Sequence, residues 1–527
     1  MYKNKINELH QQVIKKMDDG DFKDALNLTY KILNCGSHYT VSYAASGLLI
    51  DIGSALGDKK IVNEGVELLE KDFEAIIHCK RYAPTAYYNL ANGYFAVFRF
   101  KRMVDPYVAC FKETELDKVK INYRKALKYD LLDKMLTSQI WVNLGNCFDN
   151  LGRVIDALEC YEEALKWKPD HGMALGNKAL GLCYYARLID EHQRTFLLEA
   201  RSLLSQALRL GVPIEAISVF SKYLKEIQKR FSDKKVLDKP TKYPRCIIKA
   251  KSKFGKFLIS YCLKNKLYLN ICNFCQRCDV AIGDPVVIKK MIMPIRKGRD
   301  FLENNPYLRL SAYLNQIKQD YITARFLLIL SRYKGLNLNF VDKRVKIIDT
   351  LDYSIHNIYI QLVKVSFKSF YDILDKIAFF INDYLELGFS KREIDFKKVW
   401  YCNSKSKMKN KKIHRKIEKT KNFSLNALFD IHRDFENGSY RKLKKTRDAL
   451  THRFINIKMF QEIEDEENMK EDTLVMQTLE LARIVRSALI YLTYFVFVDE
   501  SEKEAKLKGI LPPMIIQELP DNLKSYR

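Results

Sequence analysis

The residues of this sequence best suited to chemistry lie together near its C-terminal end, in the hexapeptide RDALTH from Arg447 to His452. On a helix, Asp448 and His452 would lie one turn apart on the same face, where the carboxylate could orient the imidazole and favour its cationic form. The Arg447 guanidinium could hold a phosphate with two hydrogen bonds, and the imidazole could transfer a proton near neutral pH. These groups suit cleavage of RNA by its own 2′-hydroxyl, which leaves a cyclic phosphate and a 5′-hydroxyl and requires no metal.

The same side chains also fit purely structural roles. Arg447 could form an ion pair with a carboxylate such as Asp375, and His452 could cap the end of its helix. Catalysis is the interpretation that we carry forward, because of the segments that surround the hexapeptide.

Those segments are long and helical in pattern. From about Pro306 onward, apolar residues recur at helical spacing in QIKQDYITARFLLILSRY, in residues 354–387, in SLNALFDIHRDF, in the segment that ends at His452 and in TLVMQTLELARIVRSALIYLTYFVF. Helices of this length form a bundle, which we place at residues 306–500, with residues 501–527 as a C-terminal tail. His432, in FDIHRDF, is a further candidate as an accessory catalytic group.

The hexapeptide has the R-x4-6-H pattern of the HEPN superfamily, and the wider sequence resembles the HEPN domain that occurs fused behind tetratricopeptide (TPR) arrays. YITARFLL, SFKSFYDILDKIAFFINDYLELGF, FKKVW and RDALTHRF carry this resemblance. It implies a ribonuclease in which Arg447 and His452 are catalytic and Asp448 assists them. It also implies a homodimer, because in such families two copies of the motif line one cleft. Asp448 departs from the Asn that is frequent at its position.

A strongly basic run, SKSKMKNKKIHRKIEKTK, extends from Ser404 to Lys421 with nine Lys or Arg and one Glu. A solvated loop is the usual explanation for such a run. Because this one is inserted in the same domain as the hexapeptide, we expect it to bind the RNA backbone. The candidate RNA-binding residues are Lys407, Lys409, Lys411, Lys412 and Arg415.

The N-terminal part, residues 1–230, has the pattern of a repeat array. Residues 138–171 fit a TPR, whose length is roughly 34 residues, and the positions that fit are Trp141, Leu144, Gly145, Phe148, Gly152, Ala157, Tyr161, Ala164 and Pro169. Weaker copies lie on both sides, at residues 20–32, 43–79, 87–126 and 175–210. Such repeats stack into an α-solenoid with a concave groove, where we expect a protein or peptide ligand.

Between these parts, residues 231–305 break the helical period and contain prolines and short β-like runs such as KFLISYC and KLYLNIC. We expect a linker or small subdomain here. Its cysteines Cys272, Cys275 and Cys278 form a CxxCxxC, but a structural zinc site needs a second pair, and none follows. Ordinary thiols are therefore the favoured interpretation, with no bound metal.

Charge, cysteine content and hydropathy indicate where the protein is expected to be found. The formal charge of +26 is permissive for RNA binding, although an AT-rich coding bias would also enrich Lys, Ile, Asn and Tyr. The cysteines suggest no disulfide framework, and the start MYKNKINELHQQ lacks an apolar signal core. The longest uncharged apolar run, residues 487–498, is shorter than the roughly 20 residues of a spanning helix. We expect a soluble cytoplasmic protein that does not enter a membrane.

The sequence thus predicts a mostly α protein, a TPR α-solenoid followed by a HEPN-like helical bundle. The first hypothesis for its function is a metal-independent endoribonuclease controlled by the TPR array, a layout that resembles bacterial defence or toxin systems. The second is a non-enzymatic TPR adaptor whose HEPN domain dimerises or binds nucleotide or RNA. The phosphate-binding GxxxxGK, the metal-binding HExxH and the nucleophile elbow are absent from the sequence, which removes the commoner enzyme alternatives. No cofactor is expected.

Overall fold

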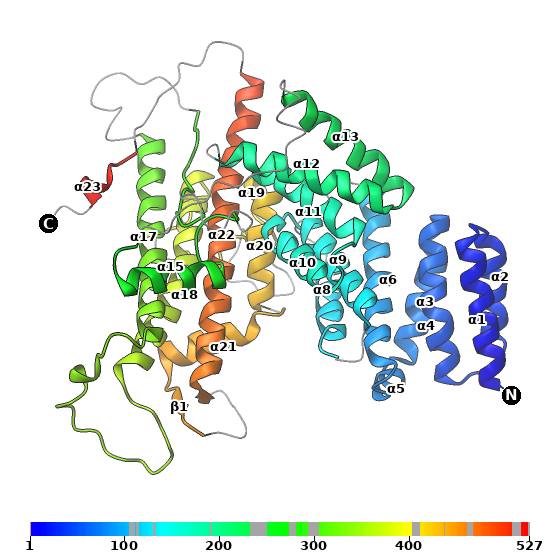
Figure 1. The fold of residues 1–527 in the computed structure, drawn as a ribbon, viewed down its shortest axis with the longest axis horizontal. Helices are drawn as coiled ribbons and strands as arrows, with labels where there is room; N and C mark the ends of the chain where they lie inside the picture. The colour runs from blue at the N-terminus through cyan, green and yellow to red at the C-terminus, as the bar shows by residue number, and fades with distance from the viewer. Residues whose placement is uncertain are drawn as a thin grey trace.

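The protein is described from a computed structural model, which is mostly helical (Figure 1). The described residues are 2–104, 111, 115–129, 133–189, 192–231, 250–272, 281–292, 305–390, 392–402, 412–436, 438–460, 467–507 and 518–524.

The N-terminal helices pack in consecutive pairs, as the repeat pattern predicts. They are α1 (Tyr2–Asp18), α2 (Phe22–Leu33), α3 (Tyr39–Leu56), α4 (Lys59–Lys71), α5 (Phe73–His78), α6 (Ala83–Val104), α8 (Glu115–Ala126), α9 (Lys134–Asn150), α10 (Val154–Trp167), α11 (Gly172–Tyr185), α12 (Gln193–Leu210) and α13 (Ile214–Arg230). We call them the repeat array. In its best-fitting repeat, α9 and α10, a side chain at Gly145 would lie 2.5 Å from the Tyr161 ring, so a glycine is needed for this close approach.

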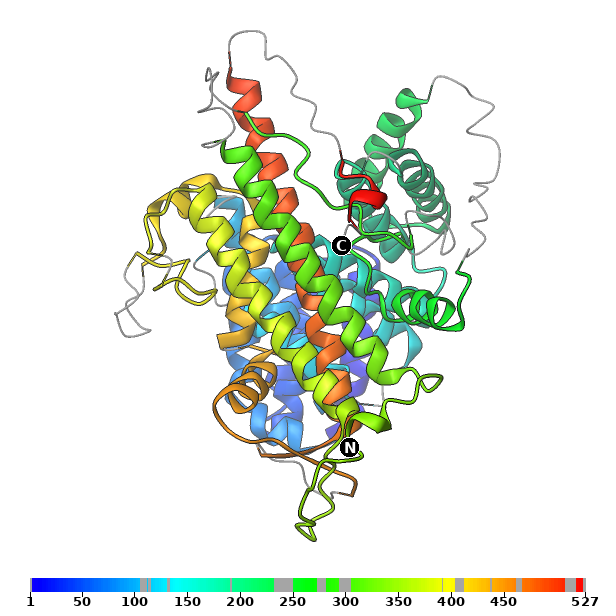
Figure 2. The same ribbon diagram turned by 90° about the vertical axis from the view of Figure 1, so that its left-hand side faces the viewer.

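The C-terminal bundle consists of α17 (Pro306–Arg332), α18 (Ile358–Tyr384), α20 (Phe423–Glu436), α21 (Arg441–His452) and α22 (Glu471–Lys506). Figure 2 shows α17, α18 and α22 in front of the repeat array, and α18 packs against both α17 and α22. The helices follow the predicted segments closely, except that α22 continues to Lys506, past the expected end of the bundle at residue 500.

Short elements complete this half: α15 (Lys253–Asn265), η1 (Asn339–Val341), α19 (Arg415–Thr420), β1 (Asn456–Lys458), β2 (Asn468–Lys470) and α23 (Asp521–Lys524). The strands β1 and β2 are parallel, with Asn456 paired to Asn468 and Lys458 to Lys470.

The prediction of a β-like run at KFLISYC was wrong, because these residues lie in α15. Phe257, Leu258, Tyr261 and Cys262 repeat at helical spacing, and the Ser252 side chain caps the helix by accepting from the amide of Gly255. KLYLNIC follows as an irregular segment. It joins the bundle directly, since Tyr321 on α17 donates a hydrogen bond to the Leu267 carbonyl at 2.9 Å.

Within the described residues, α22 is long and apolar enough to cross a membrane by length and composition. Yet 83% of its apolar window is buried inside the protein, where it packs against α18 and α20. Its apolar character is therefore accounted for by the core of the bundle.

A buried ion cluster joins the repeat array to the bundle. Asp430 and Asp434 lie one turn apart on α20, and each accepts from Lys120 of α8 and Arg153 before α10, at 2.6 to 3.0 Å. All four side chains are at most 1% exposed. Burial opposes the charge of Asp434, but Lys120 and Arg153 outweigh it and hold the pKa of this carboxyl below its ordinary value.

The turn of the best-fitting repeat is also part of this contact. Gly152 has φ +78°, and a side chain there would lie 2.0 Å from the carbonyl oxygen of Phe423, which begins α20. The glycine is therefore required both for the left-handed turn and for the close approach of the bundle.

Candidate active site

The hexapeptide occupies the second half of α21, whose burial pattern sets its orientation. Leu443, Thr446 and Ala449, spaced three residues apart, are buried toward the bundle. The Thr446 hydroxyl donates a hydrogen bond to the Gln477 side chain on α22 at 2.6 Å, which fixes α21 against that helix. As a result, Arg447 and Asp448 remain partly exposed at the surface of the bundle.

Arg447 is positioned by two neighbours. Its Nη1 lies 3.1 Å from Asp448 Oδ1, and its guanidinium stands 5.1 Å from the ring centroid of Tyr371 on α18. Partial burial opposes its charge, but Asp448 and Tyr371 outweigh burial and raise its pKa. The side chain is 28% exposed, so a fully charged guanidinium remains accessible.

The structure contains no ion pair between Arg447 and Asp375, one of the structural roles considered from sequence, within the described residues. The Asp375 carboxylate instead accepts from the amide of Phe396 at 2.9 Å. Burial raises the pKa of Asp375 and of its neighbour Asp372. Burial therefore opposes the charged form of both carboxyls, while the nearby Arg447 guanidinium favours it.

His452 is the last residue of α21 and is exposed to solvent. In the described part of the chain, no hydrogen bond joins it to Asp448, so the expected orientation of the imidazole by this carboxylate is not formed here. Its ring also makes no hydrogen bond to the helix end there, where the Arg453 amide donates to the Ala449 carbonyl instead. The imidazole is therefore accessible from solvent.

Sequence reasoning missed the part played by α18. Lys364, Lys368, Tyr371 and Asp375 recur at helical spacing along α18, which packs against α21. Lys364 donates a hydrogen bond at 2.7 Å to the carbonyl of Ile455, which is three residues after His452. Burial, followed by the charge of Lys368, lowers the pKa of Lys364. The helical spacing of these residues was the signal that could have indicated which face of α18 lies beside the hexapeptide.

An apolar surface borders the end of α21. Phe454 is 86% exposed, and Phe460, 69% exposed, meets the ring of Tyr353 at 5.8 Å between centroids. The segment that carries Tyr353 pairs with β1, because the amide of Ile355 donates to the Ile457 carbonyl at 2.7 Å. Exposed apolar side chains gathered in this way are typical of an interaction surface.

His432 does not lie with the hexapeptide. It is 2% exposed, stacks against Trp400 with ring centroids 6.3 Å apart, and lies 3.2 Å from the Tyr401 hydroxyl. Its surroundings make it a core residue of α20, not an accessory group open to substrate.

The described end of the basic run is remote from the hexapeptide. Lys407, Lys409 and Lys411 lie outside the described residues, while Lys412 and Arg415 are exposed. Lys416, which follows Arg415, donates to the carbonyl of Glu386, just beyond the end of α18. Glu386 is 15 positions after Tyr371, the α18 residue that contacts Arg447. At about 1.5 Å per residue, this separation is about 22 Å along the helix direction.

Of the cysteine cluster, Cys272 is 2% exposed and packs in the core, and Cys275 and Cys278 lie outside the described residues. Among the residues that are described, no group of three His, Cys, Asp or Glu side chains is placed to hold a metal ion.

Comparison with known protein families finds one match in each half of the chain. Residues 302–499 match the family described as LA2681-like HEPN, and residues 138–171 match the tetratricopeptide repeat. A search of curated proteins finds no match. A solved structure, titled "Crystal structure of MamA protein", is similar over 46% of this chain and 100% of its own, with 18% identity and a TM-score of 0.23. The family matches show that this chain combines a tetratricopeptide repeat with a C-terminal LA2681-like HEPN domain.

Proposed function

We propose that this protein is a metal-independent endoribonuclease whose active groups are Arg447 and His452. The observation that carries this proposal is the pairing, on one surface helix of the HEPN domain, of an accessible charged guanidinium with an exposed imidazole that has no intramolecular hydrogen bond within the described residues. The guanidinium is held by Asp448 and Tyr371 but is still partly exposed, and the imidazole of His452 is exposed to solvent.

In the proposed reaction, the 2′-hydroxyl of the RNA loses its proton to the His452 imidazole and attacks the adjacent phosphorus. The bond to the 5′-oxygen of the next nucleotide breaks, and that oxygen takes up a proton from an imidazolium. Arg447 stabilises the negative charge that builds up on the phosphate oxygens. The products are a 2′,3′-cyclic phosphate and a 5′-hydroxyl, so the atoms balance without a co-reactant. Asp448 holds the guanidinium in place at 3.1 Å.

We further propose that the active unit is a homodimer. One imidazole cannot easily serve both as the base for the 2′-hydroxyl and as the acid for the leaving oxygen, and a second copy of the motif supplies the other group. The apolar surface around Phe454, Phe460 and Tyr353 lies at the end of α21, where such a partner would bring its own motif close. The TPR array would bind a protein or peptide that controls cleavage.

Cleavage is expected to persist in excess EDTA, because a guanidinium and an imidazole supply charge stabilisation and proton transfer unaided. The measurement is the rate of cleavage of purified total RNA with and without the chelator. Activity that disappears with EDTA and returns with magnesium or zinc would contradict the mechanism.

Replacement of Lys407, Lys409, Lys411 and Lys412 by Ser is expected to weaken RNA binding and to flatten its salt dependence. If these side chains contact single-stranded RNA, each lost contact reduces the slope of log K against log salt by about 0.7. The measurement is fluorescence anisotropy with a labelled RNA over a salt series.

The matched control for this prediction removes the same charge from the last helix of the array. Lys222, Lys225, Lys229 and Arg230 are exposed on α13, and their replacement by Ser should leave the slope unchanged. Equal slopes for the two variants would show that the basic run is a solvated surface.

A further inference from the structure

A cavity of about 480 Å³ lies between the repeat array and the HEPN domain. Helices α8, α9 and α10 form one side, α22 and Tyr440 form another, and the end of α15 closes a third. Ligand sites of small molecules have volumes of roughly 300–1,000 Å³ and occur preferentially between domains. Size and place therefore both suit a small ligand.

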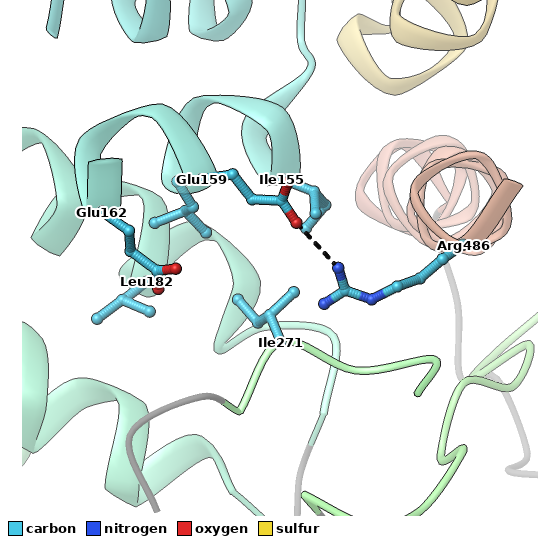
Figure 3. A pocket seen from close by; sticks show the side chains of 7 residues that line it. Ile155, Glu159, Glu162, Leu182, Ile271 and Arg486 are labelled. Carbon is cyan, nitrogen blue, oxygen red and sulfur yellow. Dashed lines mark hydrogen bonds and ion pairs between the residues drawn. The ribbon is translucent and has the colours of Figure 1, made fainter. Parts of the chain in front are cut away.

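Most acidic groups around this cavity are already neutralised by a partner. Glu163 pairs with Lys166 at 2.5 Å, and Asp156 pairs with Arg153 at 2.8 Å. Glu159 pairs with Arg486 at 3.2 Å, a contact that Figure 3 shows from an adjoining small pocket. These carboxylates contribute little free charge to the cavity.

The cations are less completely paired. Within the described residues, Arg124, Lys264 and Arg483 line the cavity without an ion pair, and Glu480 is the lining carboxylate that also has none. Burial raises the pKa of Glu480, although Arg124 and Arg483 oppose this shift. The cavity therefore presents an excess of positive charge, and an anion is the ligand that it favours.

Aromatic rings lie beside these cations. The Arg124 guanidinium is 5.4 Å from the ring centroid of Phe148 and 5.7 Å from that of Tyr440, and its Nη1 donates to the Ser439 hydroxyl. These contacts hold a planar, bidentate donor in place before a ligand arrives. Trp141, which is partly buried, also lines the cavity.

We propose that this cavity binds a mononucleotide, with its phosphate between Arg124 and Arg483 and its base against Trp141. Guanidinium groups match a phosphate with paired hydrogen bonds, and a base stacks on an indole ring whatever its sequence. The ligand would lie against Tyr440, the residue directly before the helix that carries Arg447 and His452. This site goes beyond the proposed cleavage of RNA, and its binding is measured with no RNA present.

The test is titration of the full-length protein with AMP and with GMP, followed by calorimetry and tryptophan fluorescence. Saturable binding and quenching are expected, whereas adenosine, which lacks the phosphate, and inorganic phosphate, which lacks the base, should bind much more weakly. Arg483→Gln should weaken binding by about tenfold or more, because a charge-assisted hydrogen bond is lost. Trp141→Leu should remove the quenching.

Arg209→Gln is the matched control, since Arg209 is an exposed arginine on α12 that does not line the cavity. It should bind AMP and GMP as the wild type does. The proposal is overturned if neither nucleotide binds saturably, if Arg483→Gln binds as tightly as the wild type, or if adenosine or phosphate alone binds as tightly as AMP. Arg483→Gln keeps the test decisive should Trp141→Leu fail to fold.

Discussion

Arg447→Ala and His452→Ala are each expected to remove nearly all RNA cleavage while leaving the protein folded. Loss of the guanidinium removes charge stabilisation in the transition state, which is worth about 10² to 10³ in rate. Loss of the imidazole removes proton transfer, worth about 10² to 10⁴. The measurement is the single-turnover cleavage rate, with RNA affinity measured in parallel. Both effects should fall on the rate of the chemical step and not mainly on affinity.

The matched control for these variants is His432→Asn, a histidine of the same domain that is buried away from the hexapeptide. If folded, it should retain cleavage. Mixing Arg447→Ala with His452→Ala then tests the composite site, because partial recovery would show that two chains contribute to one cleft. A strictly monomeric wild type that cleaves RNA would refute the dimer, and single variants that cleave at the wild-type rate would refute the assignment of roles.

Asp434→Ala is expected to lower the free energy of unfolding by about 3–5 kcal/mol, because it removes one of the two fully buried carboxylates that Lys120 and Arg153 share. Since this cluster joins the two halves, the variant should also loosen their contact. The measurements are urea unfolding and limited proteolysis between the array and the bundle. The control is Asp383→Ala, which breaks the more exposed ion pair with Arg309 and should cost about 0–1 kcal/mol. Equal losses for the two variants would contradict the importance of the cluster.

The contribution of Asp434 to the free energy of unfolding should depend on pH. The pKa of Asp434 is lower in the folded protein than in the unfolded chain, so its stabilising contribution is complete above the unfolded pKa of about 3.9. The contribution is lost as the pH falls below that value toward the folded pKa. The difference in unfolding free energy between the wild type and Asp434→Ala should therefore be constant near neutral pH and shrink in acid.

Local periodicity explains why much of the fold was predictable. The glycine, alanine and aromatic positions of residues 138–171 report directly on two helices in close contact, and α9 and α10 lie where this pattern places them. The run KFLISYC was misinterpreted because its composition resembles a strand, although the spacing of Phe257, Tyr261 and Cys262 was already helical. Composition is a weaker guide than spacing for short apolar runs.

The contact between the halves could not be predicted, because its partners are remote in sequence. Lys120 is 310 positions from Asp430, and Arg153 is 277. No local pattern marks such pairs. In the candidate site, the sequence identified Arg447 and His452 as one motif, but it could not supply Tyr371, which approaches the guanidinium from another helix. It also predicted a contact between Asp448 and His452 that the described residues do not form, since the carboxylate pairs with its neighbour Arg447 instead.

The most direct test of the account is the chemistry of the RNA ends that the wild-type protein produces. Purified protein is incubated with RNA in the presence of EDTA, and the new termini are identified by sequencing and by their response to phosphatase and kinase. Attack by the 2′-hydroxyl predicts a 2′,3′-cyclic phosphate on one fragment and a 5′-hydroxyl on the other. Fragments that carry a 5′-phosphate and a 3′-hydroxyl would contradict it, because those ends arise from attack by water on the phosphate.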